Sequence, residues 1–253
     1  MSFSVDWLRM REPYDHSARS QGLAQAFLGA IPAGGRVLDL AGGTGSGARY
    51  LRTLRPALDV HVVDHDPVLL EAAAGHGLGV HRADLRDVAA LRALPEVDGL
   101  QAQALLDLVS WDWLDAFVPW LCDRAVPLLA ALTVDGRVDW APEDPHDAEV
   151  QAAFRAHQAL DRGFGASPGP RAAGELAQRL EACGWSVQMA EADWQIPASD
   201  DDMVRAMLDG TAEAARVTHA DPSVVDAWLA RRHGAPPSLR VGHVDMFAVP
   251  PKR

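Results

Sequence analysis

The stretch Arg36-Val-Leu-Asp-Leu-Ala-Gly-Gly-Thr-Gly-Ser-Gly47 decides how this chain folds. Its first half, residues 37–41, is a short apolar run of the kind that forms a strand buried on both faces. The run carries one acid, Asp39, and opens at once into a glycine-rich turn, where a ligand can approach the backbone closely. A second apolar run, residues 60–63, follows and ends on another acid, Asp64. The pattern predicts a strand, turn and helix next to a second strand.

Strand-like and helix-like segments alternate along most of the chain. The expected strands are residues 37–41, 60–63, 80–84, 97–103, part of 126–134, 185–196 and 239–249. The expected helices are residues 17–31, 45–55, 67–75, 88–94, 114–125, 172–183 and a pair within 199–235. Such alternation implies a parallel sheet with right-handed crossovers. We therefore predict an α/β protein with a Rossmann-like parallel sheet of about seven strands, an antiparallel last strand and helices on both faces.

The length of 253 residues suits one large domain that carries additional segments. The expected core comprises residues 34–140, 171–198 and 237–253. Residues 1–33 are expected to form an N-terminal lid, and the turn-rich residues 141–170 a second lid over the open end of the sheet. Residues 199–236 are interpreted as a helical insertion, which could serve either as a cap or as the face of a homodimer.

The turn at the end of the first strand matches a known family pattern: an acid, any residue, then three glycines at alternate positions. Here the acid is Asp39 and alanine stands at the first glycine position, followed by Gly43 and Gly45. With Asp64 after the second strand, this segment resembles the class I S-adenosylmethionine (SAM)-dependent methyltransferases. The resemblance implies a Rossmann-like fold, SAM as the cofactor and methyl transfer as the reaction.

The same resemblance assigns roles to residues at the ends of the first four strands. Acids are expected there because the ribose hydroxyls and the adenine amine of SAM are donors that need acceptors. The segment before the first strand would fold over the cofactor. For the methionine part of SAM, the implied contacts are Arg19 with its carboxylate, Asp39 with its amino group, Ala41 and Gly43 along its length, and Gln103 at its end; Tyr14 would also touch the cofactor. For the adenosine part, Asp64 would contact the ribose, His65 the face of the adenine, and Asp84 with the Leu85 backbone the adenine edge.

Two alternatives stay open for this site. Residues 43–48 also satisfy G-x-G-x-x-A, a dinucleotide-binding fingerprint, which would make the chain an oxidoreductase. SAM is favoured because a helix is expected before the first strand and because Asp39 would crowd a pyrophosphate. The chain could also bind SAM without catalysis, as a regulatory or scaffold protein.

Residues for the methyl acceptor are harder to recognise, because methyl transfer mostly requires alignment and, for some acceptors, a place for a proton. Asp107 and His157 are the candidate catalytic residues, and Trp111, Asp161 and Phe164 are the candidate substrate contacts. If residues 149–162 are helical, His157 and Asp161 share one face. The alternatives are a helix cap for Asp107, core packing for Trp111, a solvated pair for His157 and Asp161, and a simple turn around Phe164.

The net charge, the cysteine spacing and the lack of long apolar runs limit the kinds of partner that the chain is expected to bind. A net charge of −12 argues against nucleic-acid binding, and an acceptor enclosed by lid and cap would be a small organic molecule. Cys122 and Cys183 lack metal-ligand spacing and are expected to be reduced core thiols, so no metal site is predicted. Without an apolar run of membrane-spanning length, the expectation is a cytoplasmic protein with no membrane partner.

Overall fold

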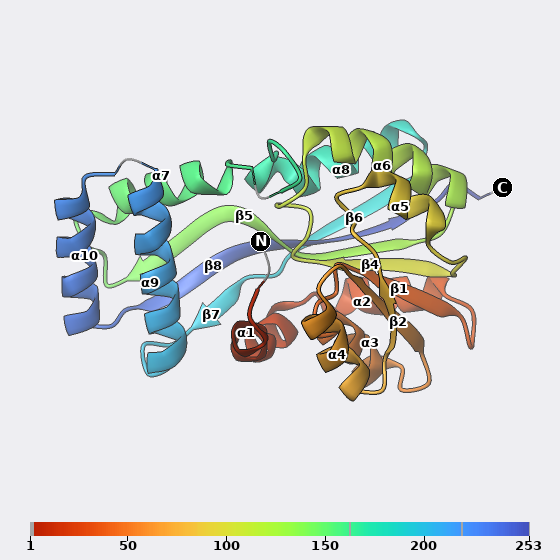
Figure 1. Ribbon diagram of the computed structural model, residues 1–253, viewed down its shortest axis with the longest axis horizontal. Coiled ribbons are helices and arrows are strands. Elements are labelled where there is room, and N and C mark those ends of the chain that lie inside the picture. The colour runs from red at the N-terminus through yellow and green to blue at the C-terminus, as the bar shows by residue number, and fades with distance from the viewer. Residues whose placement is uncertain (1–2, 162, 219, 253) are drawn as a thin grey trace.

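A mixed sheet with helices on both faces forms the framework of the protein, as the computed structural model shows (Figure 1). The structure describes residues 3–161, 163–218 and 220–252, and the following statements concern these residues. The strands are β1 (Arg36–Leu40), β2 (Asp59–Asp64), β3 (Gly79–Arg82), β4 (Gly99–Gln103), β5 (Leu128–Ala141), β6 (Ser186–Glu191), β7 (Trp194–Ile196) and β8 (Ser238–Val249). Their order is β3-β2-β1-β4-β5-β8-β6, with β7 also paired to β8. Strands β1 to β5 are parallel and β8 is antiparallel to its neighbours, so the predicted fold class is confirmed.

Helices cover the two faces of the parallel strands. One face carries α2 (Gln21–Ala30), α3 (Ser46–Leu54) and α4 (Pro67–Gly75), and the other carries α5 (Val88–Ala93), α6 (Trp111–Arg124) and α8 (Ala172–Ala182). Successive residues of a strand point to opposite faces, so in β1 Leu38 packs on the α6 side and Val37 on the α2 side. Burial of β1 on both faces explains its unbroken apolar run.

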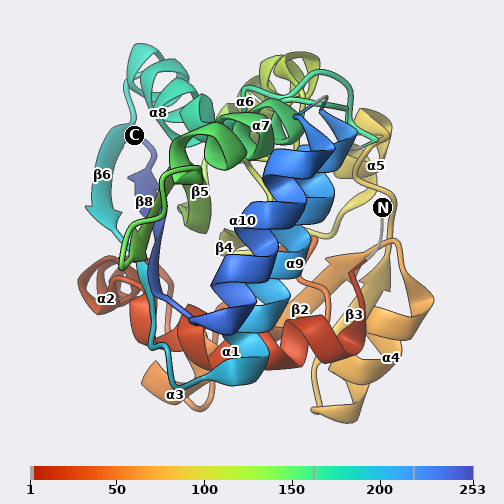
Figure 2. The same cartoon turned by 90° about the vertical axis from the view of Figure 1, so that its left-hand side faces the viewer.

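Strands β5 and β8 continue beyond the parallel sheet as a long two-stranded extension, which β7 joins (Figures 1 and 2). Helices α1 (Val5–Ala18), α7 (Asp147–Gln158), α9 (Asp201–Val217) and α10 (Pro222–Gly234) pack against it around a separate apolar cluster. The pair α9 and α10 was predicted, but β5 runs to Ala141, past the expected end at residue 134. Trp228 of α10 is fully buried there against Trp140 of β5, which fixes the insertion to the extension.

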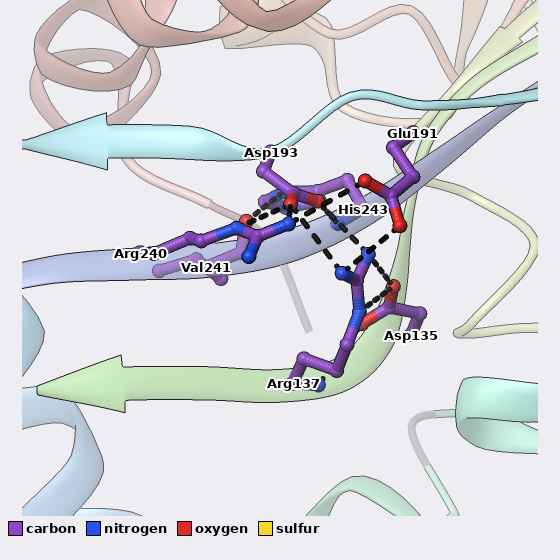
Figure 3. A network of polar contacts seen from close by, with 7 residues as sticks. All are labelled: Asp135, Arg137, Glu191, Asp193, Arg240, Val241 and His243. Atoms are coloured by element: carbon purple, nitrogen blue, oxygen red, sulfur yellow. Dashed lines mark hydrogen bonds and ion pairs between the residues drawn. The ribbon is translucent and has the colours of Figure 1, made fainter.

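The single strand predicted over residues 185–196 is interrupted between β6 and β7. Asp193, in the break, accepts hydrogen bonds from the His243 backbone N–H (3.0 Å), Arg240 Nε (2.6 Å) and Arg137 Nη2 (3.0 Å) (Figure 3). These contacts tie the break to β8 and β5. The interruption therefore has a specific anchor that hydrophobic alternation alone does not reveal.

Helix boundaries differ from the predictions in two places. The segment expected as one helix over 17–31 is two, because α1 ends at Ala18 and Ser20 caps the start of α2. Helix α7 ends at Gln158, so the prediction that His157 and Asp161 share a helical face is wrong. Asp161 instead accepts hydrogen bonds from the Gly163 and Gly165 backbone N–H groups.

Neither cysteine forms a disulfide, and Cys183 is exposed, so the prediction of a core thiol fails for this residue. Cys183 caps the C-terminus of α8, where the following Gly184 turns the chain into β6. Among the described helices, none is long and apolar enough to cross a membrane.

Asp245 of β8 holds together the elements that surround the site. Its Oδ2 accepts from the Ser20 backbone N–H at the start of α2, and its Oδ1 accepts from the Leu132 backbone N–H, both at 2.8 Å. Leu132 lies at an irregularity in the β5–β8 pairing and has a φ of 56°, a conformation that is unfavourable for a side chain with a Cβ. Asp245 is 1% exposed and its charge acts on the buried Arg19.

We expect Asp245→Ala to lower the free energy of unfolding by about 3 kcal/mol, because two backbone N–H donors lose their acceptor and the buried Arg19 loses a nearby negative charge. Urea denaturation followed by circular dichroism measures this change. Asp245→Asn, which keeps an acceptor oxygen, should lower the free energy of unfolding by less than Asp245→Ala. A loss below about 1 kcal/mol for Asp245→Ala would contradict the anchoring role.

Candidate functional site

A cavity opens at the carboxyl ends of β1 to β4, and α1 covers it. This is where open parallel sheets bind ligands, at the point where strand order reverses on either side of β1. Most of the residues that line it come from α1 and from the ends of the four strands and the loops after them; Phe3 precedes α1, Leu69 belongs to α4 and Phe164 follows α7. They are Phe3, Leu8, Arg11, Asp15, Ala41, Gly42, Gly43, Thr44, Ser46, Asp64, His65, Leu69, Ala83, Asp84, Leu85, Arg86, Gln103, Ala104, Leu105, Leu108 and Phe164.

The glycine-rich turn forms the floor of the cavity. Ala41, Gly43 and Gly45 all have positive φ (51°, 56° and 82°), the conformation that favours glycine. Ala41 adopts it without being glycine, which agrees with its place at a glycine position of the family pattern. Gly45 caps α3 without a side-chain hydrogen bond, and the buried carboxylate of Asp39 lies against the first turn of this helix, at Gly47 and Ala48.

Asp39 lies beneath this turn rather than on the cavity wall. It is fully buried, and a Cβ at Gly47 would lie 2.9 Å from its Oδ2, so the turn closes tightly over the carboxylate. Neither oxygen has a hydrogen bond of good geometry among the described residues. Burial raises the pKa of Asp39 to about 6, although the Gln101 side chain and the Arg19 guanidinium oppose this shift. The unsatisfied carboxylate suits a cationic group above the turn, reached directly or through water.

Asp64 stands at the end of β2 and faces the cavity. Its Oδ2 accepts from the Gly43 backbone N–H and its Oδ1 from the Asp66 backbone N–H, both at 3.0 Å. These bonds fix the carboxylate while Oδ2 keeps a further lone pair for a hydroxyl group. His65, next in the chain, lines the same side of the cavity, with Nδ1 3.2 Å from Asp64 Oδ1.

Asp84, after β3, already has a partner. Arg86 contacts both of its oxygens, with Nε at 2.8 and 3.1 Å, and this hydrogen-bonded pair lowers the pKa of Asp84 to about 2. Both side chains are partly exposed, so the ion pair is open to solvent competition. Asp84 can accept a hydrogen bond from a ligand amine if Arg86 moves away, or through a lone pair that Arg86 does not use.

The wall next to Asp84 is aromatic and apolar. The backbone oxygen of Leu85 accepts from Trp113 Nε1 (2.7 Å), and the Trp113 ring meets Phe164 edge-on at 6.2 Å. Phe164 lies between Gly163 and Gly165, both with positive φ. The structure therefore places Phe164 beside Leu85 at the β3 end of the cavity, and Trp113 in the core behind it.

At the other end of the cavity, α1 contributes Arg11 and Asp15, which the sequence analysis did not select. Asp15 is 1% exposed and accepts hydrogen bonds from Arg11, from Gln103 Nε2 (2.9 Å) and from Trp194 Nε1 (3.1 Å). The i,i+4 spacing of Arg11 and Asp15 was a usable signal, but Pro13 between them argued against a helix there.

Two residues predicted to touch the cofactor do not line the cavity. The Tyr14 hydroxyl donates to Asp200, and its ring packs near Trp194, so Tyr14 ties α1 to the start of α9. Arg19 is 5% exposed and donates to the side-chain oxygens of Gln103 (3.0 Å) and Gln101 (2.8 Å). Arg19 therefore holds Gln103 from behind instead of pairing with a ligand carboxylate.

Four candidates for the acceptor side also lie outside the cavity lining: Asp107, Trp111, His157 and Asp161. Trp111 begins α6 and stacks against Arg171 and Arg179, at 5.2 and 5.5 Å from the ring centroid. The Asp107 backbone oxygen accepts from Ser167 Oγ (2.7 Å). Their predicted roles thus receive no geometric support, whereas Phe164 does line the cavity.

The lining fits the chemistry of SAM. Acceptors stand at the ends of β2 and β3, and a buried unsatisfied acid lies under the turn. Among residues 3–161, 163–218 and 220–252, no group of three or more His, Cys, Asp or Glu is arranged to hold a metal ion.

Comparison with curated proteins finds partial relatives. No family model matches the chain. The chain is 31% identical over 120 residues to the trans-aconitate 2-methyltransferase of Mycobacterium tuberculosis. This alignment covers 47% of this chain and 43% of that protein, so the chain matches less than half the length of the curated relative.

Solved structures match over nearly the whole chain. The YcgJ protein of Bacillus subtilis superimposes with a TM-score of 0.53 at 17% identity, covering 94% of this chain and 100% of that chain. A putative methyltransferase of Bacillus halodurans gives a TM-score of 0.52 at 15% identity, covering 92% and 100%. At these identities the likeness shows the fold. The chain therefore has the class I methyltransferase fold, and the resemblance indicated by its glycine-rich turn is confirmed.

Proposed function

We propose that this protein is a SAM-dependent methyltransferase that acts on a small organic molecule. The observation that carries the proposal is the shared cavity: Asp64 and Asp84, at the ends of adjacent parallel strands, face the same space as the left-handed turn at Ala41 and Gly43. A partial relative named as a methyltransferase for trans-aconitate, a small molecule, supports the acceptor class.

The residues would hold the cofactor as follows. Asp64 would accept the ribose hydroxyls and Asp84 the adenine amine, with His65 and Leu85 beside the base. Asp39, the buried acid under the turn, would attract the amino group of the cofactor. When bound, SAM supplies a methyl group already activated on a sulfonium sulfur. The protein orients the two reactants, and α1 excludes water from the cavity.

The two alternatives are less well supported. A dinucleotide pyrophosphate over this turn would lie close to the buried Asp39, and like charges repel in such a place. Both strand-end acids in the cavity argue against a scaffold that has lost SAM binding, and turnover of the isolated protein distinguishes an enzyme from a regulatory protein that binds SAM. A homodimer and a cytoplasmic location stay predictions, and α9 and α10 supply none of the residues that line the cavity.

Asp64→Ala and Asp84→Ala are each expected to weaken SAM binding by about 1–3 kcal/mol, because a hydrogen bond to the ligand is lost. Isothermal titration calorimetry with SAM measures both. Asp112→Ala, an exposed acid on α6 outside the cavity, is the matched control and should bind like the wild type. Unchanged affinity in both folded variants would rule out the assigned orientation.

Cofactor affinity should depend on pH through Asp39. Its pKa of about 6 in the free protein means that it is protonated below that pH. A bound ammonium group favours the ionised form and lowers this pKa, so affinity should fall about tenfold per unit as pH drops below 6, and stay level above it. Calorimetry with S-adenosylhomocysteine from pH 5 to 8 tests this. Asp39→Asn should abolish the slope, and a persisting slope would exclude Asp39 as its source.

The position of Phe164 in the cavity lining, with its ring against Trp113, supports a contact with the adenine of the cofactor in place of the predicted substrate contact. Phe164→Ala should therefore weaken the binding of S-adenosylhomocysteine by about 1–3 kcal/mol, the range for stacking between a base and an aromatic ring. Leu160→Ala, nearby, exposed and outside the lining, is the control. If Phe164→Ala spares the affinity for S-adenosylhomocysteine but impairs use of the acceptor, the original prediction of a substrate contact holds instead.

A further inference from the structure

The two cysteines of the chain lie on neighbouring helices. Cys122 and Cys183 are its only cysteines and are far apart in the sequence. Cys122 belongs to the last turn of α6, and Cys183 caps the C-terminus of α8. Helices α6 and α8 pack against each other on one face of the sheet (Figure 1). The fold therefore brings both cysteines to the same edge of this helical layer.

The two thiol groups contact each other. The Cys183 thiol is hydrogen-bonded to the Cys122 thiol, and the Cys122 sulfur also accepts a hydrogen bond from the Trp185 side chain. Trp185, which directly precedes β6, and Leu180 of α8 are buried in the apolar cluster against which Cys122 packs. This packing and the Trp185 contact hold the Cys122 sulfur toward the end of α8, where Cys183 stands.

The two thiols differ in their access to solvent. Cys183 is exposed, whereas Cys122 is only partly exposed. Burial and the contact with Cys183 raise the pKa of the Cys122 thiol to about 11. Because the thiolate is the reactive form, Cys122 reacts poorly with reagents in solution, and Cys183 is the thiol that such reagents meet first. Redox-sensitive cysteines typically have this arrangement, with an accessible thiol next to a second one that resolves the first product.

The position of Cys183 leaves room for a small adjustment. The chain turns out of α8 through Gly184, which has a φ of 81°, and a Cβ at Gly184 would have only Pro251 within 4 Å. The end of a helix is also easier to move than its middle. A disulfide requires the sulfur atoms to approach to about 2.05 Å, so the step from thiol contact to bond is short.

We propose that Cys122 and Cys183 form an oxidation site, at which a low-molecular-weight disulfide converts the two thiols into a reversible intramolecular disulfide. The Cys183 thiolate attacks one sulfur of the small disulfide, which forms a mixed disulfide and releases one thiolate. Cys122 loses its proton to water and attacks the Cys183 sulfur, which releases the second thiolate. Two protein thiols are oxidised, the small disulfide is reduced to two thiols, and the two protons end on the released sulfur atoms.

The oxidation site is separate from the cavity. Neither cysteine lines the cavity, and both lie at the edge of the sheet where β5 and β6 begin, opposite the carboxyl ends of β1 to β4. On the cavity side, the segments before α6 and α8 are already joined, because Ser167 Oγ donates to the Asp107 backbone oxygen. A disulfide would join the opposite ends of the same two helices. It should therefore stabilise the fold and leave the affinity for S-adenosylhomocysteine unchanged, and it would form whether or not the protein transfers methyl groups.

Glutathione disulfide tests the reaction directly. Reduced protein, freed of reductant, is incubated with it, quenched with acid, and analysed by intact mass spectrometry and by thiol titration after denaturation. The expected product is a monomer that has lost both thiols, carries no glutathione and recovers both thiols with dithiothreitol. Two thiols that persist, a stable glutathione adduct of the wild type, or a disulfide-linked dimer on a non-reducing gel would overturn the proposal.

Single variants separate the two steps. Cys122→Ser should stop after the first step and keep one glutathione on Cys183. Cys183→Ser should react at least about tenfold more slowly than Cys122→Ser, because only the shielded thiol remains. Equal reaction rates of the two variants would contradict the assigned order of attack.

A displaced thiol serves as the matched control. Cys122→Ser combined with Asp123→Cys moves the thiol to an exposed position about 100° around α6. This double variant should keep glutathione adducts and form the intramolecular disulfide much more slowly than the wild type. Closure at the wild-type rate would mean that a flexible encounter, and not the native contact, joins the thiols, and would overturn the proposal.

Thermal unfolding followed by circular dichroism measures the effect on the fold. The disulfide encloses a loop of about 60 residues, so the oxidised wild type should have a Tm about 5 °C or more above that of the reduced protein. Cys122→Ser and Cys183→Ser, treated in the same way, should show no such rise. A lower Tm after oxidation would show that the native fold does not hold the two thiols in position for the bond.

Discussion

The hydrogen bonds of Asp15 are the interaction on which the arrangement of the site depends. One buried carboxylate joins α1 to the end of β4 through Gln103 and to the sheet extension through Trp194. Without it the covering helix would lose these two hydrogen bonds, and Arg11 would lose its ion-pair partner. Burial raises the pKa of Asp15, which means that desolvation opposes its charge and that its several donors compensate.

The extension of β5 and β8 also helps to hold α1 over the cavity. A helix laid over an open cavity has an outer face that also needs a neighbour, and here β7 and the start of α9 supply it through Trp194 and Asp200. The insertion α9–α10 is fixed in turn to the extension by Asp147, which accepts from Trp228 Nε1 (2.8 Å) and from the buried Arg232. The added helices therefore support the cover of the cavity rather than its lining.

The sequence predicted the parallel half well because its signals are local. Asp64 ends an apolar run and Asp84 follows the next predicted strand, and parallel strands bring such ends to one edge without further information. Arg11 was not selected because no helix was predicted over residues 5–18, and Pro13 stands in the interior of the helix that forms there. Tyr14 and Arg19 were identified as important, but their contacts with Asp200 and Gln101 depend on side-chain directions across distant elements. Asp161 ends up in a turn because two glycine N–H groups compete for it after α7.

The most direct test of the account is calorimetric titration of the purified protein with S-adenosylhomocysteine and, separately, with NAD. The account predicts saturable binding of S-adenosylhomocysteine in a one-to-one ratio and no binding of NAD, because the cavity offers acceptors for ribose and adenine above a buried acid. A folded protein that binds NAD, or that binds neither compound, would contradict it.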